Sequence, residues 1–431
     1  MLSTMPAPPV QATRQRAIAA LVVTTAAMNA AMAVASPVGT ILAADRLGTG
    51  WAGLPNTAGI VGTGLGALLL TTVAARRGWR AGLTTGYLVA VVGAAVAVAA
   101  AAVGAVAPVS LGLLLLGIGN AGALLARYAA TDHYPVRWHG FAIGVVVWGG
   151  AVGAVGGPLL LATTGTVASH LGWPALCGPF LFAGLTSAAA AAAMLAFPAG
   201  SGAGPRLGRS DGERASVPTV HPSVAPAERA DANVGNSATA TDRLSLAGLV
   251  RAPAARSAFV VMAAAQVVMV AVMTAAPVDL HRHQHGLGAI GAVMAAHTFG
   301  MFALSPITGR LADRLGTRPV MVAGLALLVV SAVLTAVVPR SGTTLPAVTL
   351  FLLGYAWNLC FVGGSTSLAG QLPPAMRTRV EGAVDAAVWG AAAVAGTGAT
   401  ALLAVGGQAL LGWTAAGLAA LPVAVLRRGG R

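Results

Sequence analysis

Methionine and histidine gather in one part of this sequence. The stretch MVAVMTAAPVDLHRHQHG begins at Met269, and HTFGM follows at His297. Met269 and Met273 are four residues apart, as are His297 and Met301, so each pair lies on one face of a helix. Thioether sulfur is a soft ligand that suits Cu(I), and imidazole also binds copper. The spacing predicts a metal site made by Met269, Met273, His297 and Met301 on two neighbouring helices.

Two further sets of residues extend this hypothesis. Met28 and Met32 are again four residues apart, and His281, His283 and His285 alternate in a polar loop. In an extended backbone the three imidazoles would point to one side and could collect a metal ion. We therefore interpret all five residues as a possible metal relay.

Each of these patterns has a plainer explanation. Methionine fills irregular gaps between helices, and the histidine loop would then be solvated or sense pH. His297 would be bonded to a neighbouring helix, although an ionisable side chain within an apolar span is costly and favours a functional role.

The composition indicates an integral membrane protein. The chain has 431 residues, of which 57% are hydrophobic and 8% charged, and its mean hydropathy is +0.81. Soluble proteins carry about 25% charged residues. Apolar runs of roughly 20 residues recur, and long runs of Ala, Leu, Val and Gly favour helices. The predicted fold is all-α, with twelve transmembrane helices near residues 17–42, 52–74, 82–106, 109–129, 140–163, 174–197, 257–279, 287–308, 320–338, 344–369, 381–404 and 407–426.

A polar segment rich in Pro, Gly, Ser and Arg divides the spans into two sets. This predicts a six-helix bundle at 1–197, a flexible linker at 198–253 and a second six-helix bundle at 254–431. The sequence contains no lysine, and its 25 arginines and net charge of +14 concentrate in alternate loops and in the linker. Because cytoplasmic loops are the positive ones, we expect both termini and the linker in the cytoplasm of a multi-pass cell-membrane protein. The bilayer accounts for the charge without a nucleic-acid partner.

Six spans, a linker and six spans resemble the major facilitator superfamily. The segment GRLADRLGTRP at 309–319 is similar to that superfamily's signature loop, and the corresponding first-half segment TTVAARRGWRA has Ala75 in place of the acid. The resemblance implies two bundles around a central substrate site and alternating access. It also implies a conformational latch formed by Gly309, Asp313, Arg314, Gly316 and Arg318.

A narrower resemblance concerns the substrate. A Met-x-x-x-Met motif in the seventh span and a His-x-x-x-Met motif in the eighth resemble the motifs of the CcoA-like copper importers. This implies a transporter that imports copper as its substrate, with Met269, Met273, His297 and Met301 as the ligands. We expect the protein to be a monomer and to need no cofactor. We also expect no enzyme activity, because no nucleophile elbow, phosphate-binding loop or carboxylate pair is present.

Another pattern favours a different transporter. The stretch GVVVWGGAVGAVGGP, with Gly144, Gly153, Gly157 and Pro158, matches most of the fifth-span motif of proton-coupled drug exporters, although close helix packing also explains such glycines. Proton-coupled efflux of drugs or small solutes is therefore the alternative function, and a sensor that binds metal without moving it is a third. Asp132 and Asp385 are the candidates for coupling.

Overall fold

The computed structural model describes residues 8–134, 139–197, 253–339, 342–371 and 374–428, and these residues are helical with short turns and no strand. The helices are α1 (Pro8–Leu47), η1 (Thr49–Trp51), α2 (Leu54–Val103), α3 (Val106–Thr131), α4 (His139–Leu159), α5 (Leu161–His170), α6 (Cys177–Ala193), η3 (Met194–Ala196), α9 (Pro253–Arg282), α10 (Leu287–Phe302), α11 (Ser305–Leu315), α12 (Thr317–Val337), α13 (Thr344–Gln371) and α14 (Pro374–Arg428).

Glycines break the two longest helices. In α2 the backbone at Gly78 has φ 83° and ψ 165°, a conformation that only glycine adopts readily. After this break the helix packs back on itself, since a Cβ at Gly86 would lie 2.5 Å from Leu70 Cδ1. In α14 the break falls at Gly406 and Gly407. Each of these helices is therefore two connected segments.

The helices are long and apolar enough to cross a membrane. In the described ranges nine helices meet this condition, or ten if α4 and α5, which meet at a 53° bend, form one span. The stretches Thr49–Val103 and Val388–Val423 contain 55 and 36 residues, and a helix needs only about 20 residues to cross the hydrocarbon core. Counting each broken stretch as two crossings agrees with the twelve expected. The prediction of an all-α membrane protein is confirmed.

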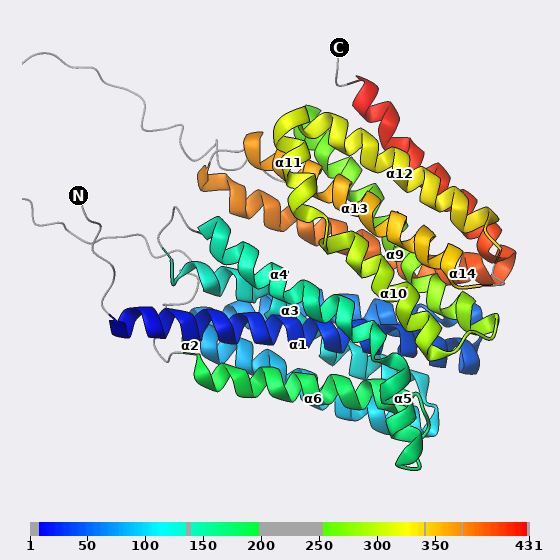
Figure 1. Cartoon of the computed structure of the whole chain (residues 1–431), viewed down its shortest axis with the longest axis horizontal. Coiled ribbons are helices and arrows are strands. Elements are labelled where there is room, and N and C mark those ends of the chain that lie inside the picture. The colour runs from blue at the N-terminus through cyan, green and yellow to red at the C-terminus, as the bar shows by residue number, and fades with distance from the viewer. Residues whose placement is uncertain (1–7, 135–138, 198–252, 340–341, 372–373, 429–431) are drawn as a thin grey trace, which may run out of the picture.

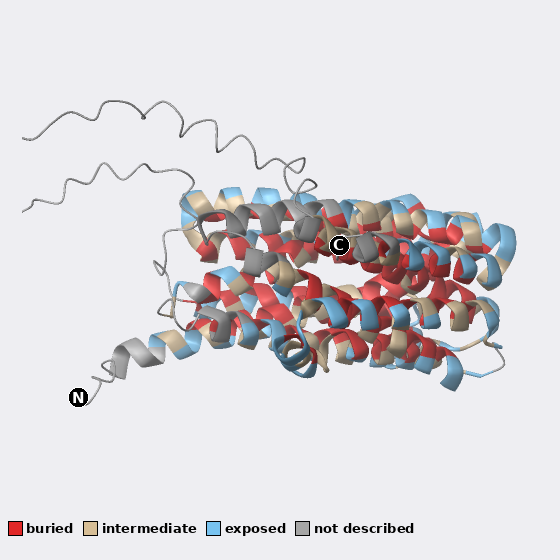
Figure 2. Ribbon diagram, turned by 90° about the horizontal axis from the view of Figure 1, so that it is seen from above, coloured by how far each residue is buried: buried red, intermediate tan, exposed pale blue. Residues whose placement is uncertain are grey.

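Each half of the chain has its own apolar core. One cluster of buried residues comes entirely from the first half, from Ala17 to Phe197. The larger of the remaining clusters comes from α9 to α14, and Ile41 of α1 also belongs to it. In Figure 1 the first half, blue to green, lies beneath the second half, light green to red. Figure 2 shows buried residues through the interior and exposed residues on the outer surfaces. The predicted linker, 198–253, lies almost wholly outside the described residues, so its boundaries stay a prediction.

The two ends of the molecule differ. The start of α1 and the end of α6, after which the linker follows in the sequence, lie at the left of Figure 1, which we call the linker end. The turns after α1, α5 and α9 lie at the opposite end, which we call the far end. Close approaches between the halves occur there: a Cβ at Gly291 would lie 2.1 Å from the carbonyl oxygen of Pro158, and one at Gly165 would lie 3.1 Å from Leu287. The two halves therefore meet at the far end.

Three local predictions were wrong. The loop expected between the second and third spans is a bend at Gly78, because one positive φ reverses the chain. The signature segment is helical up to Leu315, since Ser305 and Pro306 start a new helix, α11. The histidine loop is not extended: α9 continues through Arg282 and the chain turns at Gln284, whose φ is 63°. A helix places successive residues about 100° apart, so His281 and His283 face different neighbours.

Candidate functional site

The methionines of the predicted site belong to the core of the second half. Met269 on α9 and Met301 on α10 are buried in one apolar cluster, together with Met294, and Met273 packs against that cluster while half-buried. The helix α9 packs mainly against α14 and α13, whereas α10 packs mainly against α13. The structure therefore gathers the sulfur-bearing residues in one core, with α13 in contact with both helices.

His297 lies fully buried on α10 and is bonded to α13. Its Nδ1 is 2.9 Å from the carbonyl oxygen of Leu350. A carbonyl can only accept, so Nδ1 carries the hydrogen and Nε2 of the neutral ring keeps its lone pair. Nε2 is buried and has no hydrogen-bonding partner among the described residues. A buried polar atom without a partner costs about 1–3 kcal/mol, so a ligand at this nitrogen would offset that cost.

The donors available in this core are mainly soft. Among the described residues no three His, Cys, Asp or Glu side chains lie close enough to hold a metal ion. A metal at His297 would therefore depend on thioethers for its other ligands. Beside the Leu350 acceptor, a small cavity with room for about one water molecule is lined by Asp279, Thr335 and Gln408.

Two neighbouring residues of α13 support this core, and the sequence analysis missed both. Asn358 donates to the Met301 carbonyl (2.7 Å) and to Ser305 Oγ (2.7 Å), where the helix breaks between α10 and α11. Trp357 Nε1 donates to Oε1 of buried Gln266 on α9 at 2.6 Å. The signal that could have revealed them was the polar pair Trp-Asn inside an apolar span.

The residues of the predicted relay lie in three separate places. Met28 is fully buried in the core of the first half, and Met32 is half-buried and lies against Gly59 of α2. His281 Nε2 lies 3.2 Å from an oxygen of Asp45 on α1. His283, just after the end of α9, has its Nδ1 2.8 Å from the carbonyl oxygen of Asp279 and 3.6 Å from the carboxylate of the same residue.

The signature segment reveals the internal repeat. Gly316 has φ 86° and ψ 161°, nearly the values at Gly78 (83° and 165°), so both halves turn at the same motif glycine. Gly309 lies half-buried within α11, and Asp313, Arg314 and Arg318 are exposed. Their role as a latch stays a prediction.

The structure describes the side chain of one of the two acidic candidates for coupling, Asp132, but not that of the other, Asp385. Asp132 accepts a hydrogen bond from Trp79 Nε1 at 2.9 Å, so it ties the end of α3 to the bend of α2 within one half. Burial lowers the pKa of the neighbouring His133, and the Asp132 carboxylate opposes that shift. Asp385 lies in α14, but its side chain is outside the described residues.

Comparisons with known proteins agree with this architecture. The family model of the Major Facilitator Superfamily matches residues 257–427. The MFS-type transporter YddS of Bacillus subtilis is 30% identical over 354 residues, which cover 81% of this chain and 76% of the relative. The riboflavin transporter RfnT of Brucella anthropi is 29% identical over 280 residues, which cover 64% of this chain and 60% of the relative.

Solved structures share the fold at low sequence identity. A crystal structure of the nucleoside transporter NupG matches with a TM-score of 0.69 and 12% identity, covering 96% of this chain and 100% of that one. A structure of the peptide transporter POT with alafosfalin matches with a TM-score of 0.64 and 14% identity, covering 96% and 95%. The chain is a multi-pass membrane transporter and belongs to the major facilitator superfamily.

Proposed function

We propose that this transporter carries copper, and that Met269, Met273, His297 and Met301 bind the ion in transit. The observation that supports this most is the buried imidazole of His297, whose Nε2 lacks a partner among the described residues. Met294 and Met301 precede and follow it by three and four residues on α10, so sulfur atoms flank the ring on the same helix face.

Direction and orientation belong to the same proposal. The arginine-rich linker end faces the cytoplasm of the cell membrane, and copper enters from the far end. Both bundles rock about the site to expose it to one side at a time. The protein works as a monomer and needs no cofactor, because the ion is the substrate.

The experiment is radioactive copper uptake per unit of membrane-inserted protein. Met269→Leu, Met273→Leu and Met301→Leu keep the volume and apolar character of each side chain, so the stability should change by less than about 1.5 kcal/mol. Each removes a sulfur, so uptake should fall sharply. Met194→Leu is the control, since this methionine is fully buried in the first half and is not a proposed ligand. Uptake by all three variants at the level of the control would show that these methionines only pack.

A second candidate is a transporter of organic solutes. It is favoured by the likeness to the riboflavin transporter RfnT and by the glycine-rich α4, which resembles the corresponding span of drug exporters. Cells lacking the protein would then lose riboflavin uptake or tolerance to lipophilic cations while their copper content stays normal. Measuring copper, riboflavin and drug tolerance in the same pair of strains distinguishes the two functions.

A further inference from the structure

The start of α2 joins the two halves through buried polar groups. Asn56 Oδ1 accepts a hydrogen bond from Ser36 Oγ of α1 at 2.6 Å, and Asn56 Nδ2 donates to Thr274 Oγ1 of α9 at 2.8 Å. Asn56 and Thr274 are only 6% and 3% exposed. While the halves remain together, water does not reach these groups, so the Asn56 amide and the Thr274 hydroxyl must serve as each other's hydrogen-bonding partner.

The same segment also contacts α14. Thr57 Oγ1 lies 2.8 Å from Thr397 Oγ1, and the backbone N–H of Gly53 donates to Thr400 Oγ1 at 3.1 Å. Gly53 allows this approach because it has no side chain: a Cβ would lie 2.5 Å from the carbonyl oxygen of Gly396 and 2.9 Å from Thr397 Cα. The first turn of α2 thus lies directly against the backbone of the opposite half.

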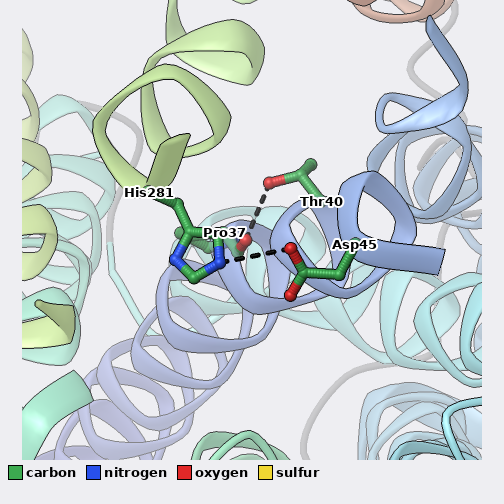
Figure 3. Close-up of polar contacts among 4 residues, drawn as sticks. All are labelled: Pro37, Thr40, Asp45 and His281. Carbon is green, nitrogen blue, oxygen red and sulfur yellow. Dashed lines mark hydrogen bonds and ion pairs between the residues drawn. The ribbon is translucent and has the colours of Figure 1, made fainter. Parts of the chain in front are cut away.

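An ion pair lies at the rim of this contact. Figure 3 shows His281, at the end of α9, pointing toward Asp45 at the end of α1, with Thr40 donating to the Pro37 carbonyl beside them. The side chains of His281 and Asp45 are 37% and 47% exposed, so the pair is screened by water and stabilises the contact little. The buried amide and hydroxyl groups carry most of the stabilisation.

We propose that residues 53–57, together with Thr274, Thr397 and Thr400, form the gate of the far end. These groups hold the halves together in the conformation described here, and they must separate before the far end opens. The gate sits close to the end of the spans, where water can enter and take over the freed hydrogen bonds. Gly53 and Asn56 are then gating residues whose role does not depend on which substrate passes.

A pair of alanine substitutions tests the close approach. Gly53→Ala places a methyl group against the backbone of α14 and should weaken the closed gate. Gly64→Ala is the matched control, because a Cβ at Gly64 meets nothing within 4 Å. The reporter is Ile60→Cys, one turn further along α2, where Ile60 is half-buried and packs against the core of the second half. Cys177 and Cys360 are replaced by alanine in every variant.

The measurement is the rate at which a membrane-impermeant maleimide labels the reporter. Sealed vesicles of both orientations are used, and a C-terminal tag identifies the face that carries the linker end. Gly53→Ala should increase labelling from the far face several-fold, while Gly64→Ala should leave it unchanged. No copper is involved, so the result is independent of the proposed substrate.

A second variant separates gating from misfolding. Thr274→Val keeps the shape of the side chain but leaves Asn56 Nδ2 without its acceptor in the closed gate, and one net hydrogen bond corresponds to a roughly two- to tenfold change in an equilibrium. Thr25→Val is its control, since the Thr25 hydroxyl bonds to Leu21 of its own helix. Thr274→Val should raise far-face labelling within that range. Labelling at the parent rate in Thr274→Val overturns the proposal, whether or not Gly53→Ala inserts into the membrane.

Discussion

Two glycines of α4 lie directly against the backbone of α1. A Cβ at Gly153 would lie 1.8 Å from the carbonyl oxygen of Ala26 and 3.0 Å from its Cα, and a Cβ at Gly157 would lie 2.9 Å from the carbonyl oxygen of Ala30. Ordinary contact between such atoms begins near 3.4 Å. Gly153→Ala therefore requires α4 to move away from α1 by about 1.5 Å. A side chain could relieve such a clash by changing its rotamer, but the backbone of a packed helix cannot.

This displacement fixes the expected size of the effect. Overpacking of a dense interior costs about 1–3 kcal/mol, and the upper end applies when the obstacle is backbone. We expect Gly153→Ala to lower the stability of the protein by about 3 kcal/mol. The thermal unfolding midpoint of the purified protein in detergent should fall by several degrees, and less protein should insert into the membrane.

Gly156→Ala on the same helix is the control for this prediction. A Cβ at Gly156 meets nothing within 4 Å, so this substitution adds a methyl group without displacing a helix. Equal unfolding midpoints for the two variants would refute the argument that α4 and α1 pack through Gly153. The contact also provides a structural reason for the glycine spacing that does not require drug export.

Two further predictions concern single side chains. Asn358→Leu keeps the branched shape but removes the donors to the Met301 carbonyl and to Ser305, so the unfolding midpoint should fall with a loss of about 2–4 kcal/mol, and a variant as stable as the parent would contradict the network. His133 has a lowered pKa in the folded chain, so the unfolded chain binds more protons and stability should decrease as the pH falls below about 6.5. His133→Gln should reduce this decrease between pH 7.5 and 5.5, and identical pH profiles would contradict it.

The sequence was sufficient for features that depend on local composition. Apolar runs predicted the helices, and the motif glycine Gly316, which the sequence analysis assigned to the latch, has φ 86° where the chain turns from α11 into α12. The degenerate first-half motif was harder to interpret, because Ala75 stands where the acid is expected. The structure shows a different arrangement there: Trp79 of the motif donates to Asp132 at the end of α3, so the bend is held within its own half.

The gate could not be predicted, because its partners are remote in the sequence. Asn56 and Thr274 are 218 residues apart, and Gly53 and Thr400 are 347 residues apart. Helical periodicity shows which residues share a face, but it does not show which helix covers that face. A polar Asn-Thr pair after Gly-Leu-Pro in an apolar span was the available signal, since such groups in a membrane require partners.

The helix α9 connects the proposed site with the gate. Met273 and Thr274 are adjacent, so their side chains point about 100° apart around the helix axis. Met273 packs against the core of the second half, whereas the Thr274 hydroxyl accepts its hydrogen bond from Asn56 of the first half. A ligand that draws Met273 toward His297 would rotate or shift α9, and the same motion would strain the bond at Thr274. Thr274→Val should therefore weaken the dependence of far-end opening on substrate while leaving all four proposed ligands in place.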